Sequence, residues 1–141
     1  QNRRKSRVGS ALENHIEEIF RQNGIRVDRD QITENKSRPD FIFPGIKEYH
    51  DSDFPADKLL MLGVKSTSKD RWRQVLAEAD RIKSKHLLTL EPGISSAQTD
   101  EMRSKQLNLV LPSVLHSSYS PDQQAWILSL NEFISLVRAS Q

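Results

Sequence analysis

The sequence predicts an α/β fold in which helices pack against a central β-sheet. Short apolar runs typical of buried strands stand at residues 38–43, 60–65, 86–90 and 107–112. Apolar residues recur at helical spacing in the segments 7–20 and 72–82, and residues 96–106 are expected to form a further helix. Because a strand, a helix and a strand follow one another over 86–112, we expect a βαβ unit whose two strands are parallel.

The first helix is expected over residues 7–20, because its apolar residues share one helical face: Val8, Leu12, Ile16, Ile19 and Phe20. We expect this helix to stop at Gly24, since glycine readily takes the left-handed conformation that follows many helices.

The first two strands carry candidate functional side chains. Side chains alternate between the two faces of a strand, so Asp40 shares a face with Ile42, and Lys65 shares one with Met61. If the two strands are neighbours in a matching register, Asp40 and Lys65 meet on one face of the sheet. The sequence does not fix that register.

A helix is expected after Lys65, because the polar residues 66–68 are typical of a helix start. Apolar residues follow at helical spacing: Trp72, Val75, Leu76, Ala79 and Ile82. Glu78 borders this apolar stripe, so we expect it to face inward, toward the ends of the strands.

The C-terminal third is expected to complete the sheet and its cover. Residues 113–122 are a turn-rich connection, and 127–130 predict a further strand. Asn131 is a candidate N-cap for a last helix, whose apolar residues are Phe133, Ile134 and Val137.

Composition agrees with one globular domain over residues 1–141. The absence of cysteine excludes disulfides, thiolate metal sites and a cysteine nucleophile, and it favours an intracellular protein. No apolar run reaches the length of a membrane span. The chain begins with Gln1 rather than methionine, so we expect a fragment whose N-terminal part is missing.

Asp40, Lys65 and Glu78 together suggest a metal-dependent phosphodiesterase. Mg²⁺ prefers oxygen ligands and is usually held by one or two carboxylates and the phosphates of the substrate. Asp40 and Glu78 are the candidate carboxylates. A nearby ammonium orients the attacking water and offsets the negative charge that develops on the phosphate, and Lys65 is the candidate for this role.

The polar loop over residues 44–55 is a further candidate, because long loops in compact domains are often functional. Tyr49 could reach the active site or a phosphate, with an ordinary residue of a surface loop as the equally weighted alternative. Asp51 and Asp53 offer metal oxygens, although a surface turn stabilised by its own side chains is the favoured interpretation.

The segment from Gly63 to Asp80 closely resembles the active-site segment of EcoRII-type restriction endonucleases, in their catalytic C-terminal domain. The resemblance implies a restriction-endonuclease-like (PD-(D/E)xK) fold with a central mixed β-sheet flanked by helices. It implies Asp40 and Glu78 as ligands of Mg²⁺ and Lys65 as the catalytic lysine. Gly63 departs from the superfamily pattern, which has an acid two residues before the lysine.

The resemblance also implies further site residues. Related nucleases carry a metal-site glutamate in their first helix, and this role falls on Glu13, with Glu17 as its competitor. The triplet 69–71, which is Lys69, Asp70 and Arg71, is implied to read the C and G bases of a CC–GG target, with CCWGG as the expected form. Basic and acidic side chains at a helix N-terminus can make such contacts in the major groove. Arg73 belongs to the same basic cluster and is a further candidate for DNA binding.

The sequence therefore predicts a Mg²⁺-dependent type II restriction endonuclease that cuts double-stranded DNA. A protein that reads a near-palindromic site and cuts both strands is expected to be a homodimer. Two alternatives remain, namely a catalytically silent DNA-binding module and a structure-specific repair or recombination nuclease of the same fold.

Overall fold

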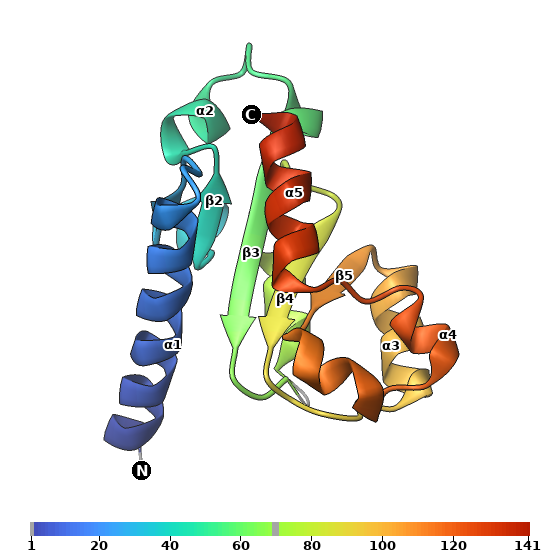
Figure 1. Cartoon of the computed structure of the whole chain (residues 1–141). Helices are drawn as coiled ribbons and strands as arrows, with labels where there is room; N and C mark the ends of the chain where they lie inside the picture. Colours follow the sequence, from blue (N-terminus) through green and yellow to red (C-terminus); the bar gives the residue numbers. More distant parts are fainter. Residues whose placement is uncertain (1, 69–70) are drawn as a thin grey trace.

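Five strands form one mixed sheet in the order β1-β2-β3-β4-β5 (Figure 1). The computed structural model describes residues 2–68 and 71–141, with side chains from residue 10 onward. The strands are β1 (Asp28–Arg29), β2 (Phe41–Phe43), β3 (Leu60–Lys65), β4 (Lys85–Thr89) and β5 (Leu107–Val110). β1, β2 and β3 pair antiparallel, whereas β3, β4 and β5 pair parallel.

Helices lie on both faces of this sheet. The α-helices are α1 (Asn2–Gln22), α2 (Ile46–His50), α3 (Ser96–Ser104), α4 (Pro121–Gln124) and α5 (Leu130–Ser140). Four 3₁₀-helices join them, namely η1 (Glu34–Lys36), η2 (Ala56–Lys58), η3 (Trp72–Ala77) and η4 (Ser113–Ser118). No helix of the described residues is both long enough and apolar enough to cross a membrane.

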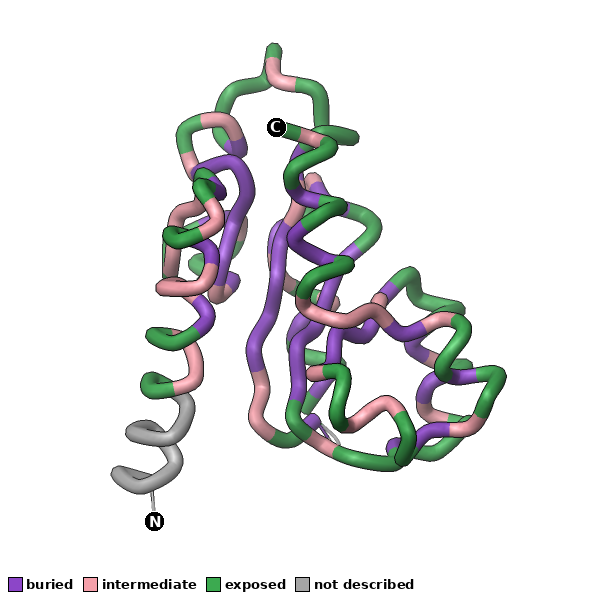
Figure 2. Tube along the Cα trace, viewed as in Figure 1, coloured by how far each residue is buried: buried purple, intermediate pink, exposed green. Residues whose placement is uncertain are grey.

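Two hydrophobic clusters hold the layers together, one on each face of the sheet. The side chains of α1 and α5 pack on Phe41, Phe43 and Leu62 of the strands. The ring of Phe20 in α1 meets that of Phe43 edge to face, with 5.2 Å between ring centres. On the opposite face, η3, α2 and α3 pack on Ile42, Met61 and neighbouring strand residues. The central strands are consequently buried along most of their length (Figure 2).

Several expectations from the sequence are confirmed. α1 contains the predicted first helix, and Gly24 beyond it has a left-handed φ of 67°. β4, α3 and β5 form the predicted βαβ unit with its parallel pair.

The predicted helix over 72–82 is wrong, because the segment does not form one regular helix. The chain makes the 3₁₀-helix η3, which ends at Ala77, and Glu78 then has extended backbone angles. Ala79 is left-handed, with a φ of 51°, so no helix can continue through it. The predicted apolar residues are nevertheless buried or packed against the core. Burial of the stripe, rather than a regular helix, accounts for the spacing seen in the sequence.

The predicted strand over 127–130 is also wrong. Only Leu128 makes a bridge, a parallel one to Val110. α5 begins at Leu130 and is capped by Ser129, not by Asn131. Ser129 and Glu132 form a reciprocal capping box, which satisfies two backbone amides at the start of the helix.

Candidate active site

Asp40 lies immediately before β2, where the chain bends into the sheet. The pairing of Phe41 with Leu62 places Asp40 beside β3, and its Oδ2 accepts a hydrogen bond from the Val64 amide at 2.6 Å. Burial raises the pKa of Asp40, while this hydrogen bond and the charge of Lys65 oppose the rise. The carboxylate is therefore held in place by the backbone of the strand that carries Lys65.

Lys65 ends β3 on the same face of the sheet as Asp40. Ile42 and Met61 are directly paired, and both belong to the cluster beneath η3. Alternation along the strands then puts Asp40 and Lys65 on that face, as the sequence predicted for a matching register. The charge of Lys65 lowers the pKa of Asp40 and of Glu78, so the three groups lie within electrostatic reach of one another.

Glu78 reaches the same place from the end of η3. Its Oε1 is buried and, within the described residues, has no hydrogen-bond partner. Burial raises the pKa of Glu78 to about 7, and the neighbouring Asp40 adds to the rise, while Lys65 and Lys85 oppose it. The fold thus keeps a desolvated carboxylate next to a second one, an arrangement that a bound cation would stabilise.

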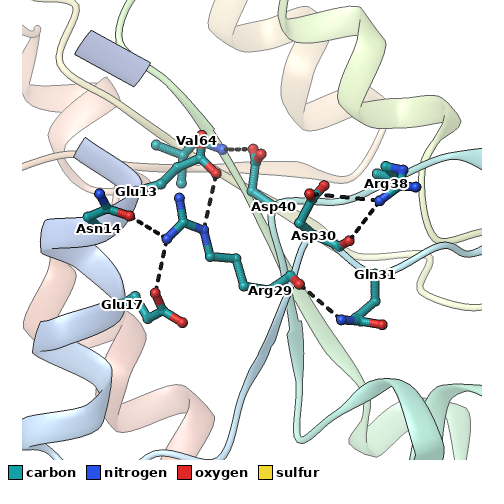
Figure 3. A network of polar contacts seen from close by, with 9 residues as sticks. All are labelled: Glu13, Asn14, Glu17, Arg29, Asp30, Gln31, Arg38, Asp40 and Val64. Atoms are coloured by element: carbon teal, nitrogen blue, oxygen red, sulfur yellow. Dashed lines mark hydrogen bonds and ion pairs between the residues drawn. The ribbon is translucent and has the colours of Figure 1, made fainter. Parts of the chain in front are cut away.

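Glu13 of α1 is the fourth member of the group. Burial raises its pKa, and Asp40 is the next largest cause of the rise. Arg29 of β1 pairs with Glu13 at 3.6 Å and with Glu17 at 3.0 Å, as Figure 3 shows. Glu13 is the less exposed of the two glutamates, and in Figure 3 it lies toward Asp40 and Val64. Of the two glutamates, the geometry brings Glu13 to the site.

Gly63 explains why this group takes its second carboxylate from Glu78. A side chain at residue 63 would point toward η3, and its Cβ would come within 3.0 Å of a methyl carbon of Val75. The position two residues before the lysine therefore has no room for an acid. Glu78, which follows η3, supplies the carboxylate on that face instead.

The donor set fits a hard cation such as Mg²⁺, which needs only one or two protein carboxylates. Asp40 and Glu78 are the candidate pair, because Asp40 raises the pKa of Glu78 and therefore lies close enough to share a cation with it. Across residues 2–68 and 71–141, no group of three or more histidines, aspartates and glutamates has the geometry of a metal site. Water and substrate phosphates would have to complete the coordination.

Tyr49 is not brought into this group. It is buried in α2, and its hydroxyl donates to Oε1 of Glu34 at 2.5 Å and accepts from the Arg81 amide at 3.1 Å. It lines a separate hollow of about 290 Å³ together with these residues. Asp51 and Asp53 are exposed, and Oδ1 of Asp51 accepts from the Asp53 amide, which is the surface-turn arrangement.

Of the predicted DNA-binding residues, the structure describes Arg71 and Arg73. Lys69 and Asp70 lie outside the described residues. Arg71 is exposed just before η3. Arg73 is exposed but engaged, since its guanidinium pairs with Glu101 of α3 at 2.6 Å and stacks on Trp72.

Three residues near the site escaped sequence reasoning, namely Arg29, Glu34 and Arg81. Arg29 holds the acids of α1, whereas Glu34 and Arg81 bind the chain around Glu78. Charged residues in loops, in a two-residue strand or in a single 3₁₀ turn carry no periodic signal, so no pattern in the sequence could have identified them.

Comparison with known proteins places this arrangement in a family. Residues 1–134 match the family model described as EcoRII C terminal. The chain is 50% identical over 135 residues to the type II restriction enzyme EcoRII of Escherichia coli, which is 95% of this chain and 33% of that protein. It therefore spans about a third of the length of this curated relative.

Solved structures give the same result at the level of the fold. Two structures of metal-depleted Ecl18kI in complex with uncleaved DNA, modified in one of them, superpose with TM-scores of 0.78 and 0.79. They share 22% sequence identity with this chain and match 99% of it, and 46% of their own chains is covered. The fold is restriction-endonuclease-like, and the chain belongs to the EcoRII C-terminal family.

Proposed function

We propose that this chain is the catalytic domain of a type II restriction endonuclease, which hydrolyses phosphodiester bonds of double-stranded DNA with the help of Mg²⁺. One observation carries the proposal. Asp40, Lys65 and Glu78 come from three separate segments, yet Asp40 raises the pKa of Glu78, and the charge of Lys65 lowers the pKa of both carboxylates, on one face of the sheet. Similarity to EcoRII over 95% of the chain supports the same proposal.

Asp40 and Glu78 would hold the metal ion, with Glu13 close enough to orient a coordinated water. When bound, Mg²⁺ lowers the pKa of a coordinated water and neutralises charge on the phosphate. The Lys65 ammonium would align the attacking water and offset the charge that develops on the phosphate oxygens. Arg29 would oppose protonation of Glu13 in the absence of metal, because its charge offsets part of the rise in pKa that burial and Asp40 cause.

Sequence specificity would come from the triplet at 69–71, which precedes η3. Arg71 would donate to a guanine, Asp70 would accept from a cytosine and Lys69 would donate to a second guanine, in a CC–GG site such as CCWGG. Reading a near-palindromic duplex with two active sites calls for a two-fold homodimer. The pairing of Arg73 with Glu101 favours a structural role for that arginine.

Digestion of plasmid DNA that contains CCWGG sites, with Mg²⁺ or with EDTA, tests the proposal. Wild-type protein should cut, and the Asp40→Ala, Lys65→Ala and Glu78→Ala variants should not. Lys58→Ala is the matched control, because Lys58 is an exposed lysine on η2. Cognate duplex should still bind to Lys65→Ala in the presence of Ca²⁺. Unimpaired cutting by Lys65→Ala would mean that the site is elsewhere.

The same experiment distinguishes a nuclease from a catalytically silent DNA-binding module. A silent DNA-binding module would retain specific binding in Ca²⁺ and give no Mg²⁺-dependent cleavage at any concentration. A structure-specific nuclease would cut flaps or junctions without preference for CCWGG. Arg71→Ala should cost about 1–3 kcal/mol of discrimination between cognate and scrambled duplexes if this residue reads a base.

A further inference from the structure

The chain on both sides of Glu78 is held by the loop that contains η1. The hydroxyl of Ser37 donates to the carbonyl of Ala77 at 3.4 Å. Oε1 of Glu34 accepts from the amide of Asp80 at 3.2 Å. The residue before Glu78 and the residue two after it are thus tied to the same loop.

Tyr49 of α2 adds to these contacts between the η1 loop and the chain around Glu78. Its hydroxyl donates to Oε1 of Glu34 and accepts from the amide of Arg81. One carboxylate oxygen and one hydroxyl therefore bind two consecutive backbone amides, those of Asp80 and Arg81. Tyr49 is 1% exposed, so this hydroxyl is fixed by the packing of its ring.

Further contacts fix the chain that follows Glu78. The guanidinium of Arg81 donates to the carbonyls of Tyr49, Asp51 and Phe54. The Lys85 ammonium donates to the carbonyl of Ala79. The segment after Glu78 is consequently fastened to α2, to the loop beyond it and to β4.

The backbone around Glu78 needs these contacts, because its conformation is unfavourable. Glu78 is extended, and Ala79 takes a left-handed φ of 51°, which an alanine rarely adopts without support. The Glu78 carboxylate is also partly desolvated, and one of its oxygens has no hydrogen-bond partner among the described residues. Left alone, the segment would relax and turn the carboxylate toward water, away from Asp40.

The loop of Glu34 also leads directly into Asp40. Ser37 and Asp40 are three residues apart, and the intervening Pro39 restricts the chain between them. The same short segment therefore carries one proposed metal ligand and anchors the other. A fixed distance between two carboxylates is what a cation site requires.

We propose that Glu34 and Tyr49 are positioning residues that hold Glu78 against Asp40 for metal binding, an inference that rests on the proposed function. Tyr49 then acts through the backbone around Glu78 rather than on the DNA. Partners that orient metal ligands typically contribute about 10–100-fold to metal affinity.

The variants Glu34→Gln and Tyr49→Phe test this inference, because each keeps the shape of the side chain. Tyr119→Phe is a matched control, since that buried tyrosine also loses a hydrogen bond, from its hydroxyl to the carbonyl of Glu91. Glu18→Gln is the control for the carboxylate, because Glu18 pairs with Arg21 on the surface of α1. Circular dichroism checks that all variants are folded.

Two readouts are needed. Binding of Mn²⁺ is followed by electron paramagnetic resonance in the absence of DNA, and cleavage of a cognate duplex is followed as a function of Mg²⁺. We expect Glu34→Gln and Tyr49→Phe each to weaken Mn²⁺ binding about tenfold and to raise the half-saturating Mg²⁺ by the same factor. The KM for DNA should stay within about twofold, and excess Mg²⁺ should restore cleavage. The double variant should lose little more than either single one, because both act through one network.

Three results would overturn the inference. One is Mn²⁺ binding by Glu34→Gln and Tyr49→Phe that equals wild type. Another is Tyr49→Phe that binds Mn²⁺ normally but stays inactive at saturating Mg²⁺, which would make Tyr49 a catalytic residue. The third is an equal loss in Tyr119→Phe, which would indicate general destabilisation.

Asp40→Ala distinguishes failure of this inference from failure of the proposed function. If Asp40→Ala abolishes Mn²⁺ binding while Glu34→Gln leaves it intact, only the positioning role is refuted. If wild-type protein neither binds Mn²⁺ nor cleaves DNA, the proposed function fails and the positioning role fails with it.

Discussion

Replacing Glu78 by glutamine should stabilise the metal-free fold while abolishing cleavage. The Glu78 carboxylate has a pKa of about 7 in the folded protein, against an ordinary value of 4.5, because burial and Asp40 disfavour its charged form. Between these values the folded chain binds more protons at this site than the unfolded chain. Stability contributed by Glu78 is therefore present at low pH and is lost as pH rises from 4.5 to about 7.

The size of the effect follows from the pKa. A change from 4.5 to about 7 corresponds to about 3 kcal/mol at ~1.36 kcal/mol per pH unit. The side chain is partly exposed, and solvent screening reduces this value, so we expect about 2 kcal/mol. The glutamine in Glu78→Gln carries no charge at any pH, so the variant does not have to bury a charged group. At pH 8 its free energy of unfolding should exceed that of wild type by about 2 kcal/mol, and at pH 4 the two values should agree within ~0.5 kcal/mol.

Urea unfolding from pH 4 to pH 8, in EDTA, measures this difference directly. A parallel series in excess Mg²⁺ should favour wild type, because a ligand at 100 times its Kd stabilises the folded state by about 2.7 kcal/mol. The reasoning would be refuted if Glu78→Gln were less stable than wild type at pH 8 in EDTA. A difference that does not change with pH would refute it equally.

Three further predictions concern other residues around the sheet. Burial lowers the pKa of His86 from 6.5 to about 4, so the contribution of His86 to the free energy of unfolding should fall by about 3 kcal/mol as pH falls through that range, and in urea unfolding His86→Leu should gain that amount relative to wild type. Gly63→Asp should lower the free energy of unfolding by at least ~1–3 kcal/mol, since its Cβ meets Val75 at 3.0 Å, and adding Val75→Ala should recover part of it. Glu13→Gln should slow cleavage by about tenfold or more, whereas Glu17→Gln, at the more exposed glutamate, should stay near wild type in the same plasmid assay.

The opposite pH dependences of Glu78 and His86 fall in nearly the same range. The stability contributed by Glu78 falls as pH rises, while the stability contributed by His86 rises with pH, because the buried imidazole is neutral in the folded protein. Wild-type stability should accordingly vary little between pH 4.5 and 6.5, and each single variant should expose the slope of the other group. A flat wild-type curve alone is therefore no evidence that either pKa is normal.

Much of the fold could be predicted because it depends on burial patterns. Strands β2 to β5, the long α1 and the βαβ unit all follow from apolar periodicity, which reports directly which residues lie inside. The faces of Asp40 and Lys65 were predictable for the same reason. Their register needed the structure, because it is set by pairing across the sheet rather than by neighbours in the sequence.

The remainder of the site depends on backbone conformation, which periodicity does not report. The apolar spacing after Trp72 is satisfied by a 3₁₀-helix and a left-handed alanine, so it predicted burial correctly and the helix wrongly. Glu34 and Arg81 act through backbone amides and carbonyls far away in sequence. Such contacts are specified by tertiary structure alone, and the sequence around them looks like an ordinary polar loop.

Gly63 and Glu78 together show why the acid of this site cannot sit on β3. With no side chain at residue 63, η3 packs directly on the strand through Val75, and the end of η3 brings Glu78 over the same face. An acid at residue 63 would push η3 away and carry Glu78 with it. The glycine and the displaced glutamate are thus one structural solution, and neither can be changed alone without loss of the pair of carboxylates.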